Sequence, residues 1–213
     1  MSISEKLLNL QSSIVVAIDG TSASGKGTLA KLMAERFNLT YCQTSLFYRG
    51  LALKASQNNI GDSIIDLIEL SKQPLDITDS AELYTPKVTE TASQIAAIPE
   101  IRENLLKPQK DFLASHKRIV MEGRDIGTVI APDADLKLFI TADLKVRAER
   151  RQKQMLENGV DVTVEEVMDA IEERDKRDSS RISAPLLKAQ DAIAIDTTNN
   201  SPDDIIESLL KRG

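Results

Sequence analysis

The sequence has a single cysteine and a single histidine, and each scarcity excludes a class of site. Cys42 has no partner for an intramolecular disulfide, which fits a reducing compartment. The apolar residues before it predict a buried, inert side chain rather than a catalytic thiol. His116 stands apart from any cysteine or other histidine, so we do not expect a zinc site.

Long hydrophobic runs are absent too. A membrane-spanning helix needs about 20 apolar residues in succession, and no segment approaches that length. The stretch 4–10 mixes charges with leucines and lacks the hydrophobic region of a signal peptide, so it predicts a short helix. We therefore expect a cytoplasmic protein with no membrane partner. Because the sequence shows no internal repeat or linker, residues 1–213 are expected to form a single domain, and we expect a monomer.

An excess of positive charge is also missing. The 27 Lys and Arg residues are outnumbered by 33 Asp and Glu residues, which gives a formal net charge of −6. Proteins that bind nucleic acid usually carry a net basic surface, so no nucleic-acid partner is expected. A local group of arginines can still bind a small anion, because attraction at short range outweighs the overall charge.

The sequence does contain an alternation of strand and helix patterns. Apolar or β-branched runs predict strands at 14–18, 39–42, 118–121, 136–140 and 192–195. Amphipathic spacing predicts helices at 26–37, 45–56, 63–72, 88–97, 99–113, 143–157, 164–181 and 202–211. This order predicts an α/β fold of three layers, in which a parallel sheet is flanked by helices on both faces. Pro108 should interrupt or kink its helix, residues 73–86 show no period, and Asn158-Gly159 should end the helix at 143–157.

A glycine-rich loop separates the first predicted strand from the helix that follows it. The loop fits the pattern G-x-x-x-x-G-K and consists of Gly20, Thr21, Ser22, Ala23, Ser24, Gly25 and Lys26, followed by Gly27 and Thr28. Glycines let successive backbone N–H groups converge on phosphate oxygens, and the helix presents its positive end to the same anion. An incidental glycine turn is the alternative. The position between a buried strand and an amphipathic helix favours ATP or GTP binding.

Two side chains of this loop add chemistry of their own. Lys26 places a full charge where the β- and γ-phosphates would lie, and the hydroxyl of Thr28 can orient a phosphate or Mg²⁺. Gly27 departs from the general pattern, which has Ser or Thr directly after the lysine. The resulting G-K-G-T form is similar to that of small-molecule kinases of the nucleoside monophosphate group.

Three further segments carry arginines that suit a second anion. They are Tyr48-Arg49, Glu122-Gly123-Arg124-Asp125 at the carboxyl end of a strand, and Arg174, Asp178 and Arg181 on the predicted helix 164–181. Ligands bind at the carboxyl ends of strands in open parallel sheets. On the last helix an apolar stripe continues into these charged residues, which indicates either a polar cleft or a solvated helix end. The other two arginine sites favour the cleft.

In their order along the chain, these motifs resemble the bacterial cytidylate kinases. The resemblance extends from Ile14 through nearly the whole chain and rests on the phosphate loop, Tyr48-Arg49, 92–96, Ile101-Arg102, 122–129, 132–134, 147–151, 173–178, Arg181 and 184–186. It implies a P-loop NTPase-type fold with a short NMP-binding insert on the acceptor side, within 44–115, and a lid segment at 143–160. The family's insert bears a small sheet, which residues 75–89 are too few to hold completely.

The resemblance also assigns roles to residues on the acceptor side. It implies that Ser93, Arg102 and Asp125 read the cytosine, that Arg49, Arg124 and Arg181 hold the CMP phosphate, and that Arg174 and Asp178 face the ribose. Tyr48 belongs to the same substrate side, and Thr44 keeps a hydroxyl where the family has Asp-Ser-Gly or Asp-Thr-Gly and this chain has Gln43-Thr44-Ser45. Uracil would place a carbonyl oxygen against the carboxylate of Asp125, which disfavours UMP.

The expected reaction is transfer of the γ-phosphoryl group of ATP to CMP and dCMP. A nucleotide phosphate needs no general base, since its second pKa is about 6, and Lys26, Arg124, Arg181 and Mg²⁺ would compensate its charge. Thr28 and the phosphates would hold the metal, with Asp19 and Asp125 as further candidates. Arg147, Arg150 and Arg151 share a helical face that would close over ATP, unless the helix is an exposed one paired with Glu149 and Asp143. The remaining alternatives are an adenylate, uridylate or shikimate kinase and a regulatory nucleotide-binding protein without turnover.

Overall fold

A computed structural model describes residues 1–61, 63–157 and 159–211, which fall into two compact units. The first unit comprises Met1–Cys42, His116–Ser180 and Ala184–Gly213, and the second comprises Gln43–Ser115 together with Arg181–Ser183. The second unit is close in extent to the segment 44–115 predicted for the acceptor side. Its functional assignment remains a prediction.

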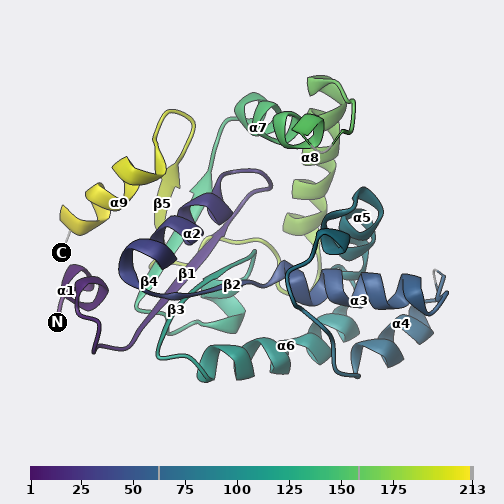
Figure 1. The fold of residues 1–213 in the computed structure, drawn as a ribbon, viewed down its shortest axis with the longest axis horizontal. Coiled ribbons are helices and arrows are strands. Elements are labelled where there is room, and N and C mark those ends of the chain that lie inside the picture. The colour runs from purple at the N-terminus through teal and green to yellow at the C-terminus, as the bar shows by residue number, and fades with distance from the viewer. Residues whose placement is uncertain (62, 158, 212–213) are drawn as a thin grey trace. The chain divides into compact units, whose positions relative to one another are not determined.

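The first unit is built on a parallel sheet (Figure 1). Its strands are β1 (Ile14–Gly20), β2 (Thr40–Gln43), β3 (Arg118–Glu122), β4 (Leu136–Thr141) and β5 (Ile193–Asp196), in the order β2-β3-β1-β4-β5. In the register of the central strands, Val16 lies opposite Val120 on one side and Leu136 on the other. The strand positions, the α/β class and the parallel arrangement predicted from the sequence are therefore confirmed.

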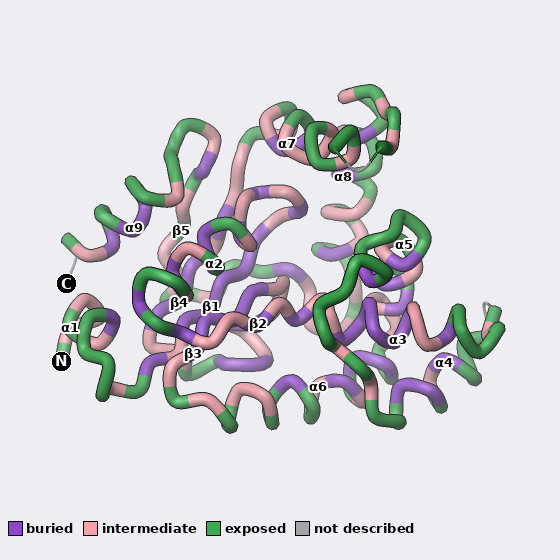
Figure 2. The backbone as a smooth tube through the Cα atoms, in the orientation of Figure 1, coloured by how far each residue is buried: buried purple, intermediate pink, exposed green. Residues whose placement is uncertain are grey.

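Both faces of the central strands are buried, as the continuous apolar runs of parallel strands require (Figure 2). On one face, side chains such as Ile14, Val16 and Ile18 pack in a core with residues of three helices. These helices are α1 (Ile3–Leu8), α2 (Lys26–Phe37) and α9 (Pro202–Lys211). On the other face, Ala17 and Met121 are fully buried as well. The sheet therefore holds the carboxyl ends of β1 and β3 in a rigid frame.

Arg118, the first residue of β3, fastens the N-terminal segment to this frame. Its guanidinium donates to the carbonyls of Lys6, Leu7, Asn9 and Ser12, at 2.7–3.0 Å, and to that of Phe37 at 2.9 Å. These carbonyls belong to or follow the ends of α1 and α2, where helix carbonyls lack partners within the helix. One side chain therefore caps both helices at the edge of the sheet away from the phosphate loop.

Two further helices of the first unit pack against each other, α7 (Leu144–Glu157) and α8 (Val164–Ser180). Ala148, Val167 and Ile171 form their small buried core. Asn158, predicted to help end α7, lies outside the described residues. Gly159 has a φ of +76°, a conformation that suits glycine in the turn between the helices.

The second unit consists of helices among its described residues. They are α3 (Ser45–Gln57), α4 (Ile64–Ser71), α5 (Pro86–Ile95) and α6 (Pro99–Ala114), with a 3₁₀ turn η1 at Ala81–Tyr84 inside the stretch predicted to be irregular. No strand occurs in the described part of 75–89. This agrees with the expectation that the segment is too short for a complete sheet-bearing insert.

Pro108 was predicted to interrupt or kink its helix, and the structure contradicts the interruption. Helix α6 runs without a break from Pro99 to Ala114, with Pro108 inside it. Proline removes one backbone donor, but Ile101 and Leu105 before it and Gln109 after it are all buried, so packing holds the two halves together. The amide of Gln109 also donates to the carbonyl of Leu105 at 3.0 Å. Tertiary burial thus outweighs the local penalty.

The structure bears on two of the expectations above, those about membrane-spanning helices and about the single cysteine. Among the described residues, no helix is both long and apolar enough to cross a bilayer. Cys42 is a free, buried cysteine on β2. Burial, with a smaller contribution from the charge of Glu122, raises the pKa of its thiol to about 12. The thiol is therefore protonated at neutral pH, and the prediction of a buried, inert cysteine is confirmed.

Candidate functional site

The phosphate loop joins β1 directly to α2, as predicted. Gly20 has a φ of +146°, and a Cβ there would lie 1.9 Å from the carbonyl oxygen of Ile140 on β4, so only glycine fits. Gly25 precedes the helix with a φ of +88°. These two glycines allow the chain to turn back over the sheet and present its backbone at the start of α2.

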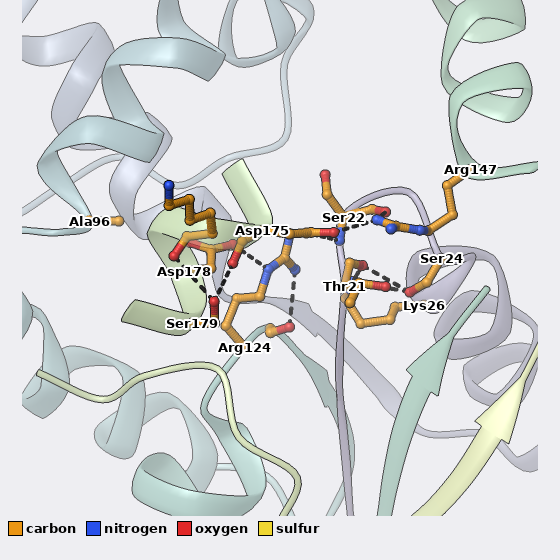
Figure 3. Close-up of polar contacts among 12 residues, drawn as sticks. Thr21, Ser22, Ser24, Lys26, Ala96, Arg124, Arg147, Asp175, Asp178 and Ser179 are labelled. Carbon is orange, nitrogen blue, oxygen red and sulfur yellow. Dashed lines mark hydrogen bonds and ion pairs between the residues drawn. The ribbon is translucent and has the colours of Figure 1, made fainter. Parts of the chain in front are cut away.

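Lys26 is buried beneath this loop (Figure 3). Its ammonium donates to the carbonyl of Thr21 at 2.6 Å and lies 3.5 Å from the hydroxyl oxygen of Ser24. The pKa of Lys26 is lowered from 10.5 to about 7. Burial is the largest cause, and the positive charges of Arg124 and Arg174 add to it, while the carboxylates of Glu122 and Asp175 offset part of the shift. The surroundings of the ammonium therefore carry too little negative charge to balance it, and a bound triphosphate would supply that charge.

This electrostatic deficit predicts that ATP binding takes up a proton. At pH 8 a lysine with a pKa of about 7 is mostly neutral, whereas phosphate beside it favours the ammonium form. We expect an uptake of about 0.9 proton per ATP at pH 8, and much less from Lys26 at pH 6, where it is already charged. Calorimetric titration with ATP in HEPES and in Tris buffer measures the uptake, because the buffers differ in ionisation enthalpy.

The control for this measurement is Lys26→Met, which should bind ATP more weakly and without the proton uptake at pH 8. If the apparent binding enthalpy of the wild-type protein were the same in both buffers, Lys26 would already be charged before ATP arrives. That result would contradict the lowered pKa.

Gly27, which departs from the usual motif, lies against a carboxylate from the neighbouring strand. A Cβ at this position would approach Oε1 of Glu122 to 3.2 Å. Oε1 also accepts a hydrogen bond from the hydroxyl of Tyr41 at 2.8 Å. A serine or threonine after Lys26 would therefore require this carboxylate to shift by a few tenths of an ångström.

Asp19, at the end of β1, links the loop to the segment that follows β3. Its two carboxylate oxygens each accept a backbone N–H at 2.8 Å, from Ile126 and Gly127 at the start of the π-helical turn η2 (Ile126–Ile130). Burial raises the pKa of Asp19 to about 6, although these two N–H groups lower it in part. The carboxylate is thus committed to positioning the backbone directly after Arg124 and Asp125.

Arg124 lies beyond the carboxyl end of β3 and pairs with α8 (Figure 3). Its Nε lies 2.7 Å from Oδ2 of Asp178, and its NH1 donates to the carbonyl of Gly123 at 3.2 Å. Burial alone would lower the pKa of Arg124, but Asp178 outweighs burial and raises it above the usual value. Among the predicted acceptor residues, the first unit brings Arg124 together with Asp178, and Arg124 and Arg174 lie near enough to Lys26 to affect its pKa.

Two of the three arginines on α7 contact the region of the phosphate loop. Arg147 donates to the carbonyl of Ser22 at 3.1 Å and forms an ion pair with Asp175 of α8. Arg150 donates to the carbonyl and hydroxyl of Thr197, at 2.6 and 3.0 Å. Their partners are not Glu149 and Asp143, so the interpretation as an exposed, self-paired helix does not hold for them.

Arg151, the third arginine of this face, has a different environment. Its NH1 lies 3.5 Å from the side-chain oxygen of Gln154 on the same helix. Burial lowers the pKa of its guanidinium. Two arginines of the face predicted for α7 therefore have contacts outside their own helix. Arg147 contacts the phosphate loop, and Arg150 contacts Thr197 after β5.

In the second unit, Arg49 is held at the junction of η1 and α5. Its NH1 donates to the carbonyl of Leu83 at 2.6 Å and to the hydroxyl of Thr89 at 2.9 Å. The guanidinium carbon lies 4.9 Å from the centre of the Tyr84 ring. Arg49 is buried, so these contacts replace the water that its charge would otherwise attract.

The base-reading residues predicted for this unit lie on neighbouring helices. Arg102, near the start of α6, donates to the carbonyl of Ala96 at 3.1 Å, and its guanidinium carbon is 5.6 Å from the ring centre of Tyr48. Ser93 on α5 and Thr44 before α3 are buried. Arg181 belongs to this unit as well, whereas Lys26 and Arg124 belong to the first. The predicted catalytic residues are therefore divided between the two units.

Three residues without a role predicted from the sequence are connected to the loop in the structure. Glu122 ends β3, and Thr197 follows β5 and donates to the carbonyl of Ser24 at 2.7 Å. Asp175 on α8 accepts a hydrogen bond from the N–H of Ser22 at 2.9 Å. For Glu122 and Thr197 a signal existed, since both stand at carboxyl ends of predicted strands. For Asp175 the only signal in the sequence was its position one helical turn after Ile171, which belongs to the apolar stripe.

Comparisons with known proteins agree with this arrangement. A protein of Eubacterium ventriosum, described as uncharacterized, has a solved structure that matches 94% of this chain and 97% of its own with a TM-score of 0.55 and 16% identity, which shows the fold alone. Cytidylate kinase of Rickettsia bellii is 45% identical over 97% of this chain and 95% of its own length, and that of Rickettsia canadensis is 41% identical over 98% and 96%. The family model described as cytidylate kinase matches residues 16–212. The chain belongs to the cytidylate kinase family.

Proposed function

We propose that this protein transfers the γ-phosphoryl group of ATP to CMP, giving CDP and ADP, and that it also accepts dCMP. The observation that carries the proposal is the juxtaposition at the carboxyl edge of the sheet. Lys26, buried under a phosphate loop, lies within electrostatic range of Arg124 beyond the adjacent strand. A donor phosphate and an acceptor phosphate can both be neutralised at this edge.

In this mechanism the protein supplies position and charge rather than a base. The acceptor phosphate is largely a dianion near neutral pH, since its second pKa is about 6, so its oxygen can attack without losing a proton. The loop amides and Lys26 hold the β- and γ-phosphates, while Arg124 and Arg181 hold the acceptor phosphate. Charge that shifts during transfer is stabilised by groups that are already oriented, which lowers the barrier more than binding alone would.

We assign the recognition of CMP to the acceptor-side residues. In this proposal Arg49 contacts the acceptor phosphate, and Ser93, Arg102 and Asp125 bind the cytosine through its amino group and ring acceptors. Arg174 and Asp178 are to face the ribose, with Thr44 and Tyr48 lining the acceptor side. The burial of Arg49, Arg102 and Asp125 supports these roles, because buried charged groups provide strong, specific hydrogen bonds to a ligand.

Mg²⁺ fits this site as an ion held mainly by phosphate and water. Among the described residues, no group of three or more His, Cys, Asp or Glu side chains could hold a metal ion by itself. Asp19 uses both carboxylate oxygens to hold backbone N–H groups, which makes it a poor ligand. Thr28 in the first turn of α2 would bind the ion, and Glu122 beside Gly27 would hold its water. When bound, Mg²⁺ neutralises phosphate charge.

The remaining assignments follow from the same reaction. Residues 44–115 would form the NMP-binding side, and 143–160 would act as a lid in which Arg150 and Arg151 contact ATP. We propose that the protein acts on ATP and CMP in the cytoplasm, as a monomer with no nucleic-acid or membrane partner. The contacts of Arg147 and Arg150 near the phosphate loop support the lid assignment.

An acceptor panel tests the proposal. CMP, dCMP, UMP, AMP and shikimate are each supplied with ATP and Mg²⁺, and ADP formation is followed by a coupled assay. We expect CMP to give the highest kcat/KM and UMP to be at least about 100-fold poorer, because UMP leaves buried polar groups unpaired. Faster turnover of UMP, AMP or shikimate would overturn the choice of acceptor. ADP formation that CMP does not stimulate would favour a regulatory nucleotide-binding protein.

A further inference from the structure

The phosphate loop contains a strained corner. Ala23 has a φ of +56°, in the left-handed region, where a residue with a Cβ is disfavoured by about 1 kcal/mol or more. Such a conformation persists only where surrounding groups hold it. Within the loop, the hydroxyl of Ser24 donates to the carbonyl of Thr21 at 2.9 Å and so spans the corner.

Further groups that hold this corner come from the two helices α7 and α8 (Figure 3). The N–H of Ser22 donates to Oδ1 of Asp175 at 2.9 Å, and its carbonyl accepts from NH1 of Arg147 at 3.1 Å. The other oxygen of Asp175 forms the ion pair with Arg147. Both polar groups of one loop residue are thus fixed by a single carboxylate–guanidinium pair, and Ala23 packs against the small apolar core of the two helices.

Both members of this pair are largely shielded from water. The side chains of Arg147 and Asp175 are 10% and 17% exposed, which leaves little water to compete for their charges. Arg147 is anchored a third time, through Nε to the carbonyl of Ala142 at 3.0 Å. Asp175 projects from the turn of α8 that also carries Arg174 and Asp178. The pair therefore connects the donor loop to the helix that carries acceptor-side residues.

We propose that Asp175 is a positioning residue, which acts through Ser22 and Arg147 to hold the phosphate loop in its ATP-binding shape before ATP arrives. Pre-organisation of this kind contributes to affinity, because the cost of ordering the loop is met on folding instead of on binding. The inference rests on the proposed function only in taking ATP as the ligand. It does not depend on the identity of the acceptor.

The test compares ATP affinity, measured by calorimetric titration without acceptor, in the wild-type protein and in Asp175→Asn. Asparagine keeps an oxygen for the N–H of Ser22 but removes the charge that pairs with Arg147. We expect the Kd for ATP to rise about tenfold, and the KM for ATP to rise likewise with kcat changed less than about threefold. Glu172→Gln is the matched control, since Glu172 is an exposed carboxylate on the same helix and should leave Kd unchanged.

A double-mutant cycle separates positioning from mere support of the fold. If Asp175 acts through Arg147, then Arg147→Gln and the double variant should raise Kd by about the same factor as Asp175→Asn. Additive losses, or an Asp175→Asn protein with a lower melting temperature and an unchanged Kd, would overturn the inference. Arg147→Gln provides the measurement on its own if Asp175→Asn does not fold. A wild-type protein that failed to bind ATP would refute the proposed function first and this inference with it.

Discussion

Replacing Lys26 by methionine is expected to lower kcat by about 10³-fold while leaving the protein folded. Methionine keeps the buried stem but removes the charge that compensates the transferring phosphoryl group. Stability should not fall, because burial disfavours the ammonium of Lys26 in the folded chain. Since its pKa of about 7 is below the unfolded value, the charged form opposes folding at neutral pH. Steady-state kinetics and thermal unfolding measure the two effects together.

The comparison for this variant is Lys110→Met, in which an exposed lysine of α6 is changed in the same way. It should retain wild-type turnover and melting temperature. A Lys26→Met protein with kcat within about tenfold of the wild type would mean that the ammonium is not needed in the transition state. A large fall in melting temperature would show instead that the bonds from Lys26 to Thr21 and Ser24 are structural.

Replacing Arg124 by methionine is expected to lower kcat/KM for CMP by about 10³-fold and to destabilise the fold. The first effect follows from the loss of a guanidinium at the acceptor phosphate. The second follows from the ion pair with Asp178, whose side chain is only 9% exposed. Removing one member of a buried ion pair costs about 3 kcal/mol. Coupled assays and denaturant unfolding measure the two losses.

The double variant Arg124→Met/Asp178→Asn distinguishes these two causes. Removing the charge of Asp178 as well should recover most of the lost stability, whereas activity with CMP should stay low. Lys176→Met is the control, since this lysine is an exposed cation of the same helix α8, and its loss should change neither quantity much. Activity that returned with stability would show that Arg124 is structural, and its role at the phosphate would be wrong.

Periodicity alone was enough to locate most of the fold. The strand runs and the amphipathic helices lie within a few residues of their predicted bounds, and α2 matches at both ends. These elements are predictable because burial on one or both faces imposes a period on each of them. Pro108 is the exception. Buried side chains on either side of Pro108 outweigh the local effect of proline. The residues that these side chains contact cannot be identified from a local sequence pattern.

The candidate site was predictable where a backbone motif dictates it. Gly20 and Gly25 had to be glycine because of the turn, and Lys26 followed by spacing. The charge partners were not predictable in the same way. Arg124 and Asp178 stand far apart in the sequence, yet their side chains meet at 2.7 Å. The strained φ of Ala23 and its support by Asp175 were also invisible to spacing.

The sequence by itself determined a parallel α/β fold, a phosphate loop between its first strand and helix, and the family to which the chain belongs. It could do so because hydrophobic period and loop geometry are local, and each is encoded in consecutive residues. Only the tertiary structure decided which charges pair, which carboxylates hold backbone instead of ligand, and how far Lys26 is driven from its usual pKa. Those properties depend on distance and burial, which arise when segments from different parts of the chain are packed together.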